Sequence, residues 1–149
     1  MHKRVLLPLD GSTIAEQALP HAVQQAERFR ANLILLQAIN PLPHGGALTA
    51  IELGWVQEQA GEWARDYLES IATEVRARGI PAKVVISLEP AHEAITQFAE
   101  TNGVGLIVIS SRGHSGPSRW LMGSVADRVV RGAAMPVLLV RGHGGMGVS

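Results

Sequence analysis

A glycine- and serine-rich segment, residues 110–124, holds the groups best suited to binding an anion. Its glycines let backbone N–H groups approach a phosphate closely, and they are Gly113, Gly116 and Gly123. Ser124 stands where a helix is expected to begin, and a helix N-terminus offers unpaired N–H donors and partial positive charge. Three basic side chains could add charge, namely Arg112, His114 and Arg119. The combination favours a phosphate-binding loop over a purely structural crossover.

A second candidate is the short segment 8–12, Pro-Leu-Asp-Gly-Ser, which lies between an apolar run and a predicted helix. The carboxylate of Asp10 could accept hydrogen bonds from ribose hydroxyls or help to hold a metal ion. The same residues are also typical of a turn followed by a helix cap. Local chemistry alone leaves both interpretations open.

Other kinds of site have little support in this sequence. It contains no P-loop motif and no nucleophile elbow, and its six histidines form no i, i+3 or i, i+4 pair of the kind that binds zinc. Cysteine is absent, which excludes disulfides and thiolate ligands. Gly142, Gly144 and Gly147 match a dinucleotide-binding spacing, but too few residues follow them to form the required helix. We therefore interpret residues 142–149 as a disordered tail.

Length and composition suit one soluble domain. The chain has 149 residues, 46% of them hydrophobic, and its 13 basic residues balance 13 acidic ones. A neutral chain lacks the basic footprint of a nucleic-acid-binding protein. No apolar run approaches the ~18 residues of a membrane span, and the start of the chain does not resemble a signal peptide. We therefore expect a cytoplasmic protein that binds neither nucleic acid nor membrane.

Short apolar runs alternate with longer helical patterns along the chain. The runs predict strands at 5–9, 33–39, 82–86, 106–109 and 137–140, and the helical patterns lie at 13–30, 50–78, 90–101 and 124–133. Continuous apolar character indicates strands buried on both faces, as in a parallel sheet covered by helices. Right-handed crossovers then predict an α/β, Rossmann-like fold with a doubly wound five-stranded sheet. In such a sheet, ligands bind beyond the carboxyl ends of the strands, where both candidate segments lie.

Local patterns refine the expected helices. Residues 13–16, Thr-x-x-Glu, have the spacing of a capping box, and residues 124–127, Ser-x-x-Asp, resemble the same arrangement at the last helix. Trp55 and Trp63 lie at near-helical spacing and are expected to pack one face of the long helix. Residues 41–46 are rich in proline and glycine and are expected to form a loop.

Taken in order along the chain, these segments resemble the universal stress protein family. The family's nucleotide signature, G-x2-G-x9-G-[ST], is matched by Gly113, nine intervening residues and Gly123-Ser124, while Ser110 replaces the first glycine. The opening segment 8–12 and the closing run 135–140 also resemble the family. The likeness implies one universal stress protein domain over residues 1–141.

The resemblance implies an ATP-binding member of the family, with Mg²⁺ accompanying the nucleotide. The implied binding residues are Pro8, Leu9, Asp10, Ala38, Ile109, Ser110, Gly113, Gly123, Ser124 and Val125. The first four would lie against adenosine, and the last three would hold phosphates. Arg112 and His114 join this set through their positive charge. Another branch of the family lacks the glycine signature and does not bind ATP, but serine is small and can donate a hydrogen bond, so Ser110 is expected to be tolerated.

The sequence therefore predicts a nucleotide-binding protein of the stress response, with a regulatory role. One alternative is an interaction protein of the same fold that does not bind ATP. Another is a slow ATP hydrolase in which Asp10 or His114 assists water or a metal ion. No pair of residues identifies a general base with its orienting partner, so we expect no catalytic residues and slow or absent turnover.

The last predicted strand suggests how two chains associate. Residues 137–140 are four consecutive apolar residues in an expected edge strand, and a bare edge of this kind invites uncontrolled pairing. Antiparallel pairing of two such segments, residues 137–141, about a two-fold axis would satisfy their backbone groups. We therefore predict a homodimer formed through the fifth strand.

Overall fold

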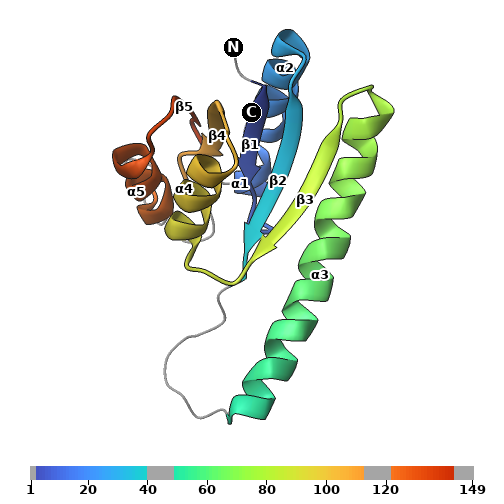
Figure 1. The fold of residues 1–149 in the computed structure, drawn as a ribbon, viewed down its shortest axis with the longest axis vertical. Coiled ribbons are helices and arrows are strands. Elements are labelled where there is room, and N and C mark those ends of the chain that lie inside the picture. Colours follow the sequence, from blue (N-terminus) through green and yellow to red (C-terminus); the bar gives the residue numbers. More distant parts are fainter. Residues whose placement is uncertain (1–2, 40–48, 113–121, 143–149) are drawn as a thin grey trace.

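The computed structural model describes residues 3–39, 49–112 and 122–142, and its strands form one sheet. The strands are β1 (Arg4–Pro8), β2 (Asn32–Ala38), β3 (Ala82–Ser87), β4 (Leu106–Ser110) and β5 (Val137–Val140). All neighbouring strands pair in parallel, in the order β3-β2-β1-β4-β5 (Figure 1). The predicted doubly wound α/β sheet is therefore confirmed.

Helices cover both faces of this sheet. They are α1 (Thr13–Glu16), α2 (Leu19–Phe29), α3 (Ala50–Ala77), α4 (Ala91–Thr101) and α5 (Ser124–Gly132). Buried residues of α1, α2 and α3 form one apolar cluster with the sheet, and those of α4 and α5 form a second cluster. The winding reverses between β1 and β4, because the chain leaves these two neighbouring strands toward opposite faces.

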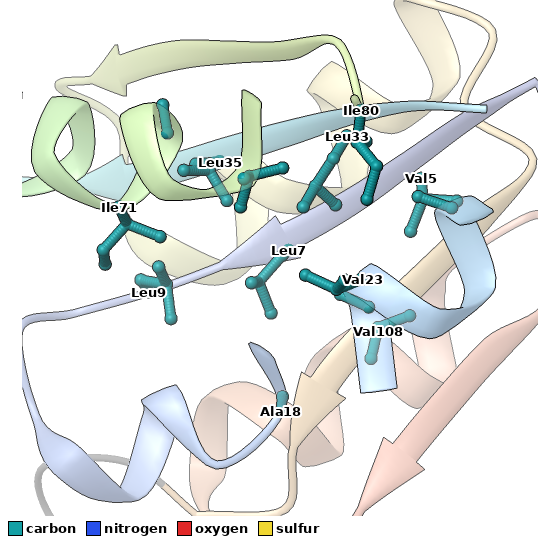
Figure 2. Packing of buried hydrophobic residues seen from close by; sticks show 14 of the residues in the cluster. Val5, Leu7, Leu9, Ala18, Val23, Leu33, Leu35, Ile71, Ile80 and Val108 are labelled. Atoms are coloured by element: carbon teal, nitrogen blue, oxygen red, sulfur yellow. The ribbon is translucent and has the colours of Figure 1, made fainter. Parts of the chain in front are cut away.

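The central strands are apolar on both sides because both sides are covered. Leu7 and Leu35 belong to the cluster beneath α1–α3, as Figure 2 shows, whereas Leu6 and Ile34 belong to the cluster beneath α4 and α5. Successive side chains of a strand point to opposite faces, so a strand buried twice must be apolar at every position. The uninterrupted apolar runs of the sequence follow from this double burial.

The helix predicted over residues 13–30 is in fact two helices. α1 ends after Glu16, and α2 begins at Leu19 with Pro20 in its first turn. Proline has no N–H to donate to the carbonyl four residues earlier, and its ring crowds that carbonyl. A continuous helix through Pro20 would need that bond to Glu16, so the chain restarts the helix instead.

Two expected caps are also different in the structure. Ser12, not Thr13, is the N-cap of α1, and its Oγ accepts a hydrogen bond from the Ala15 N–H at 3.1 Å. The N-cap of α5 is Gly123, which has no side chain to donate or accept, so Ser124 lies inside the helix. Each helix therefore begins with its N-cap one residue earlier than predicted, at a serine for α1 and at a glycine for α5.

The long helix α3 has two unlike halves. Its buried residues all lie between Ala64 and Val75, whereas the preceding half extends past the end of the sheet (Figure 1). Trp55 and Trp63 are 67% and 70% exposed. The expectation that these tryptophans pack against the rest of the fold is wrong, because most of each side chain is exposed to solvent.

The remaining expectations concern the ends of the sheet and the segments around it. β5 is an edge strand, as predicted, and Leu139 is 39% exposed there. The expected loop 41–46 and residues 143–149 of the expected tail lie outside the described residues. The disordered tail was predicted to begin at Gly142, but this residue is buried and donates a hydrogen bond to Ser111, so the prediction is wrong there. None of the helices in the described ranges combines the length and the apolar character that crossing a membrane would require.

Candidate functional site

A cavity of 270 Å³ opens at the carboxyl edge of the sheet, where the winding reverses between β1 and β4. Chains that leave adjacent strands toward opposite faces create a crevice at this point of a doubly wound sheet. The lining residues are Pro8, Leu9, Asp10, Ala15, Ala91, Ile109, Ser110, Arg112, Gly123, Ser124, Val125 and Ala126. The cavity therefore joins the two segments that the sequence singled out.

Nine of the twelve residues predicted for the site line this cavity. Ala38 does not: it lies at the end of β2 and packs against the apolar cluster beneath α4 and α5. Gly113 and His114 lie outside the described residues, as does the third loop cation, Arg119. The structure thus brings together residues 8–10, 109–112 and 123–125.

Sequence reasoning missed three alanines in the lining, Ala15, Ala91 and Ala126. Each lies in the first turn or near the start of a helix that follows a strand or loop at this edge. An alanine carries no chemical signal of its own. The only available clue was topological, because helix starts converge on the carboxyl edge of a parallel sheet.

The segment after β1 is organised as a turn that leads into α1. Asp10 Oδ1 accepts hydrogen bonds from the Ser12 N–H at 2.9 Å and from the Ser12 hydroxyl at 2.6 Å. Gly11 has φ +88°, a left-handed conformation that glycine adopts without steric cost. The turn-and-cap interpretation of this segment is therefore confirmed. Asp10 also lines the cavity, so the same residue belongs to the turn and to the candidate site.

The segment after β4 is tied to its neighbours by backbone hydrogen bonds. Ser111 donates its N–H to the Val140 carbonyl at 2.7 Å, and its own carbonyl accepts from the Gly123 N–H at 2.7 Å. The Ser111 Oγ accepts a third bond, from the Gly142 N–H at 2.9 Å. These contacts fix the start of α5 beside the end of β4, where the cavity lies.

Gly142 closely approaches the site from the end of β5. A Cβ atom on Gly142 would lie 2.6 Å from the Ser110 Oγ and 2.9 Å from the Ile14 Cγ2, both too close for real atoms. The Ser110 hydroxyl also accepts a long hydrogen bond, 3.4 Å, from the Arg112 N–H. The sequence drew attention to Gly142 through a false dinucleotide motif. Its actual role is to leave room for Ser110.

The start of α5 offers the donors that a phosphate needs. Gly123 has extended backbone angles, and its carbonyl accepts from the Asp127 N–H at 2.9 Å, so the helix begins at Ser124. The first N–H groups of a helix have no partner within it, and the helix dipole places partial positive charge at them. Arg112, which is only 7% exposed, adds a full positive charge to the same cavity.

A tyrosine on α3 connects this edge to α1. The Tyr67 hydroxyl donates to Glu16 Oε2 at 2.5 Å. Burial raises the pKa of Tyr67 above its usual value, and the nearby negative charges of Glu16 and Asp10 raise it further. The phenol is therefore a neutral donor at physiological pH and cannot act as a general base.

The described lining combines anion donors with an apolar wall. Pro8, Leu9 and Ile109 provide the wall, and α5 and Arg112 provide positive charge. Asp10 is the sole carboxylate among the described lining residues. Within the described ranges, no three acidic or histidine side chains cluster closely enough to hold a metal ion. The arrangement suits a ligand with an apolar or aromatic part and a phosphate.

Comparison with known proteins identifies the family. A model of the universal stress protein family matches residues 1–141 of this chain. Universal stress protein MJ0531 of Methanocaldococcus jannaschii is 30% identical over 142 residues, covering 95% of this chain and 83% of that protein. Universal stress protein YxiE of Bacillus subtilis is 31% identical over 149 residues, covering 95% of this chain and 100% of YxiE.

Solved structures share the fold. Universal stress protein UspA from Lactobacillus plantarum superposes with a TM-score of 0.76 at 24% identity, covering 94% of this chain and 98% of UspA. A universal stress protein in complex with cAMP gives 0.62 at 22% identity, with 95% and 98% covered. One from Archaeoglobus fulgidus in complex with dAMP gives 0.58 at 21% identity, with 93% and 97% covered. The chain described here belongs to the universal stress protein family.

Proposed function

We propose that this protein binds an adenine nucleotide, ATP with Mg²⁺, in the cavity between β1, β4 and α5, and acts as a cytoplasmic stress-response binding protein rather than as an enzyme. One observation carries the proposal. Segments 8–10 and 109–112, far apart in the sequence, line a single cavity together with the start of α5. An apolar wall and a helix N-terminus in one cavity are what a nucleoside phosphate needs.

Different lining residues would contact different parts of the nucleotide. Pro8, Leu9 and Ile109 would cover the nucleoside, and the first turn of α5 would receive the phosphates. Arg112 strengthens that end, because hydrogen bonds between ions are about twice as strong as neutral ones. Mg²⁺ is usually held by one or two carboxylates plus the phosphates of its nucleotide. Asp10 could supply the carboxylate and the nucleotide the remaining oxygens.

The choice of adenine rests on family members with this fold. Two of them have been solved with adenine nucleotides, one with cAMP and one with dAMP. The preference for the triphosphate rests on the glycine spacing, because the backbone of Gly123 and Ser124, at the start of α5, would receive more than one phosphate.

Slow turnover is expected from the same lining. Fast hydrolysis of ATP requires a positioned water and groups that stabilise the transition-state charge. Arg112 could contribute to the second requirement. Asp10, the carboxylate among the described lining residues, already accepts two hydrogen bonds from Ser12 at its Oδ1, so that oxygen is engaged in the turn. A bound nucleotide would then act by setting a conformation or a partner preference.

A second candidate function is an interaction protein that does not bind ATP. The observation in its favour is Ser110, which stands where the family signature has glycine and whose hydroxyl lies against Gly142. The side chain is 4% exposed and lines the cavity, so it takes space that a glycine would leave open.

Thermal unfolding with Mg-ATP separates these functions. A ligand at a hundredfold excess over its Kd stabilises the folded state by about 2.7 kcal/mol. For a domain of this size, the melting temperature should rise by roughly 4–10 °C. Chromatography of the same sample after several hours should still show ATP. No shift at millimolar ATP would favour the interaction protein, and turnover near ~1 per second would favour an enzyme.

We also propose that two chains pair through β5. The carbonyls of Pro136 and Val140 accept hydrogen bonds from the β4 segment, so Leu139 directs its backbone groups toward the open edge. Light scattering should therefore give a dimer at micromolar concentration. Leu139→Lys places like charges across the two-fold axis and should shift the mass toward a monomer. Val130→Lys, at an exposed position of α5, is the matched control. A monomeric parent protein would contradict the proposal.

A further inference from the structure

A second cavity, of 1120 Å³, lies at the opposite edge of the sheet, where β1 and β2 begin. Its lining residues are Lys3, Arg4, Arg28, Phe29, Arg30, Asn32, Gly103 and Gly105. Four of these eight residues are basic and none is acidic. The whole chain carries as many acidic as basic residues, so this concentration of positive charge is local.

Helix ends explain part of this charge. α2 and α4 both end at this edge, and cations near a helix C-terminus are stabilised by its unpaired carbonyls. Arg4 acts in this way, since its Nη1 donates to the Asn102 carbonyl at 2.7 Å. The acidic neighbour Glu27 pairs with Arg78 at 3.5 Å and does not line the cavity. Lys3, Arg28 and Arg30 remain exposed around the opening.

The backbone of Arg30 indicates more than a capping role. Arg30 is the C-cap of α2 with φ 53° and ψ 47°, a left-handed conformation. Glycine normally occupies this position, because a side chain is strained there. The other positive φ angles in the described ranges belong to Gly11, Gly79 and Gly103. Strained residues that persist in a fold cluster at functional sites. Here, the strained residue is a cation at the mouth of a cationic cavity.

We propose that this cavity binds a small anion that carries two or more phosphate groups. Several cations around one concavity favour a multivalent anion, because each phosphate can pair with a different cation. The Asn32 side chain can donate a hydrogen bond as well. Four basic residues on a neutral chain fit a compact ligand better than the long basic stripe that a nucleic acid requires. The site is separate from the nucleotide cavity, which lies at the other end of the strands.

Nuclear magnetic resonance of the full chain can test the proposal with sodium tripolyphosphate as the probe. The amide signals of Gly103 and Gly105 report on the amino edge, and those of Gly123 and Ser124 report on the carboxyl edge. One titration therefore separates binding at the two sites. We expect the signals of Gly103 and Gly105 to shift and saturate at low ionic strength, and the affinity to fall as salt screens the charges.

Three variants identify the groups responsible. Arg28→Gln and Arg30→Gly should each weaken binding at Gly103 and Gly105 by about fivefold or more, since each removes one charged partner. Arg65→Gln, an exposed arginine of α3 outside the cavity, should leave that affinity unchanged. Arg30→Gly should also keep or raise the melting temperature, by about 2–4 °C, because glycine relieves the left-handed strain. If Arg30 only capped α2, its replacement would not weaken tripolyphosphate binding. Weaker binding by Arg30→Gly with unchanged or higher stability would therefore support a role in the site.

Several outcomes would overturn the proposal. Unchanged signals of Gly103 and Gly105 at about 10 mM tripolyphosphate, a concentration beyond millimolar affinity, would exclude the site. Equal losses in Arg65→Gln and Arg28→Gln would show a non-specific charge effect. If Arg28→Gln binds as the parent does, the cations serve the helix ends alone. Tighter binding of a single-stranded oligonucleotide at the same amides would replace the small ligand by a nucleic acid.

Discussion

The two edges of the sheet offer positive charge by different means. At the carboxyl edge, it comes from backbone N–H groups at the start of α5 and from one buried arginine, Arg112. At the amino edge, it comes from side chains, with Lys3, Arg28 and Arg30 around an open cavity. A site built from backbone depends on glycine and on fixed geometry. A site built from long side chains tolerates exposure and adapts to its ligand. The first kind should fail abruptly on substitution, and the second gradually.

The largest expected effect is at the carboxyl edge. Gly123→Val should reduce ATP affinity by about a hundredfold, because a valine side chain enters the place where phosphate meets the helix N-terminus. Ser110→Ala should reduce it by at most about tenfold, because it removes no more than one hydrogen bond. Titration calorimetry of both variants gives the comparison.

Gly54→Val is the matched control for this pair. Gly54 lies in α3, and a Cβ atom there would meet nothing within 4 Å. Its affinity for ATP should equal that of the parent protein. Similar affinities for Gly123→Val and Ser110→Ala would show that the start of α5 does not hold the phosphates.

The next effect concerns the close contact behind the carboxyl edge. Gly142→Ala should cost about 1–3 kcal/mol of stability, because its Cβ would overlap Ser110 and Ile14. Ser110→Gly should restore part of this loss by removing one of the two contacts. Gly132→Ala is the control, since its Cβ would lie 4.0 Å from the nearest atom, on Thr96. Urea unfolding compares the parent, the two single variants, the double variant and the control, and additive losses in the double variant would disprove the coupling.

This contact shows where prediction from sequence reaches its limit. The strands and their parallel arrangement followed from the apolar runs. Most of the nine lining residues followed from the resemblance to the universal stress protein family. The contact between Gly142 and Ser110 could not be predicted. It depends on how closely the ends of β4 and β5 approach each other in the folded sheet. The same holds for the cationic cavity, whose residues become neighbours only when residues 3–4 lie beside 28–30 and 103–105.

The sequence predicted that local features such as helix caps would be present, but not the residues at which they occur. A cap was expected at the start of the first helix, but the choice between Ser12 and Thr13 depends on backbone angles that the sequence does not contain. The break before Pro20 was missed because the apolar spacing continues across it. The helix is interrupted because Pro20 has no backbone N–H, although the spacing of apolar residues would allow it to continue.

A smaller effect would show how α3 supports the carboxyl edge. Tyr67→Phe removes the hydrogen bond to Glu16 and should cost about 0.5–1.5 kcal/mol near neutral pH. The fold raises the pKa of Tyr67 above its usual ~10, so its stabilising contribution is complete below about pH 10 and is lost as the pH rises further. The parent should therefore lose stability above about pH 10 more steeply than the variant does. Parallel pH curves would contradict the contact.

The smallest expected effect is that of an amino-edge substitution on ATP affinity. Arg28→Gln at the amino edge should change ATP affinity by less than about twofold, because substitutions at distant sites without shared partners act independently. Calorimetry with Mg-ATP measures it directly. A clear loss of ATP affinity would mean that the two cavities are energetically coupled through the sheet. They could then no longer be treated as independent sites.

The exposure of the tryptophans on α3 determines what tryptophan fluorescence can measure in this protein. Two of its three tryptophans, Trp55 and Trp63, stand in water on that helix while the sheet is folded. Their emission should change little when the core melts, because their surroundings are aqueous before and after. Circular dichroism will follow the unfolding of the sheet and helices. Quenching of the two indoles will instead reveal any partner that covers the outer surface of α3.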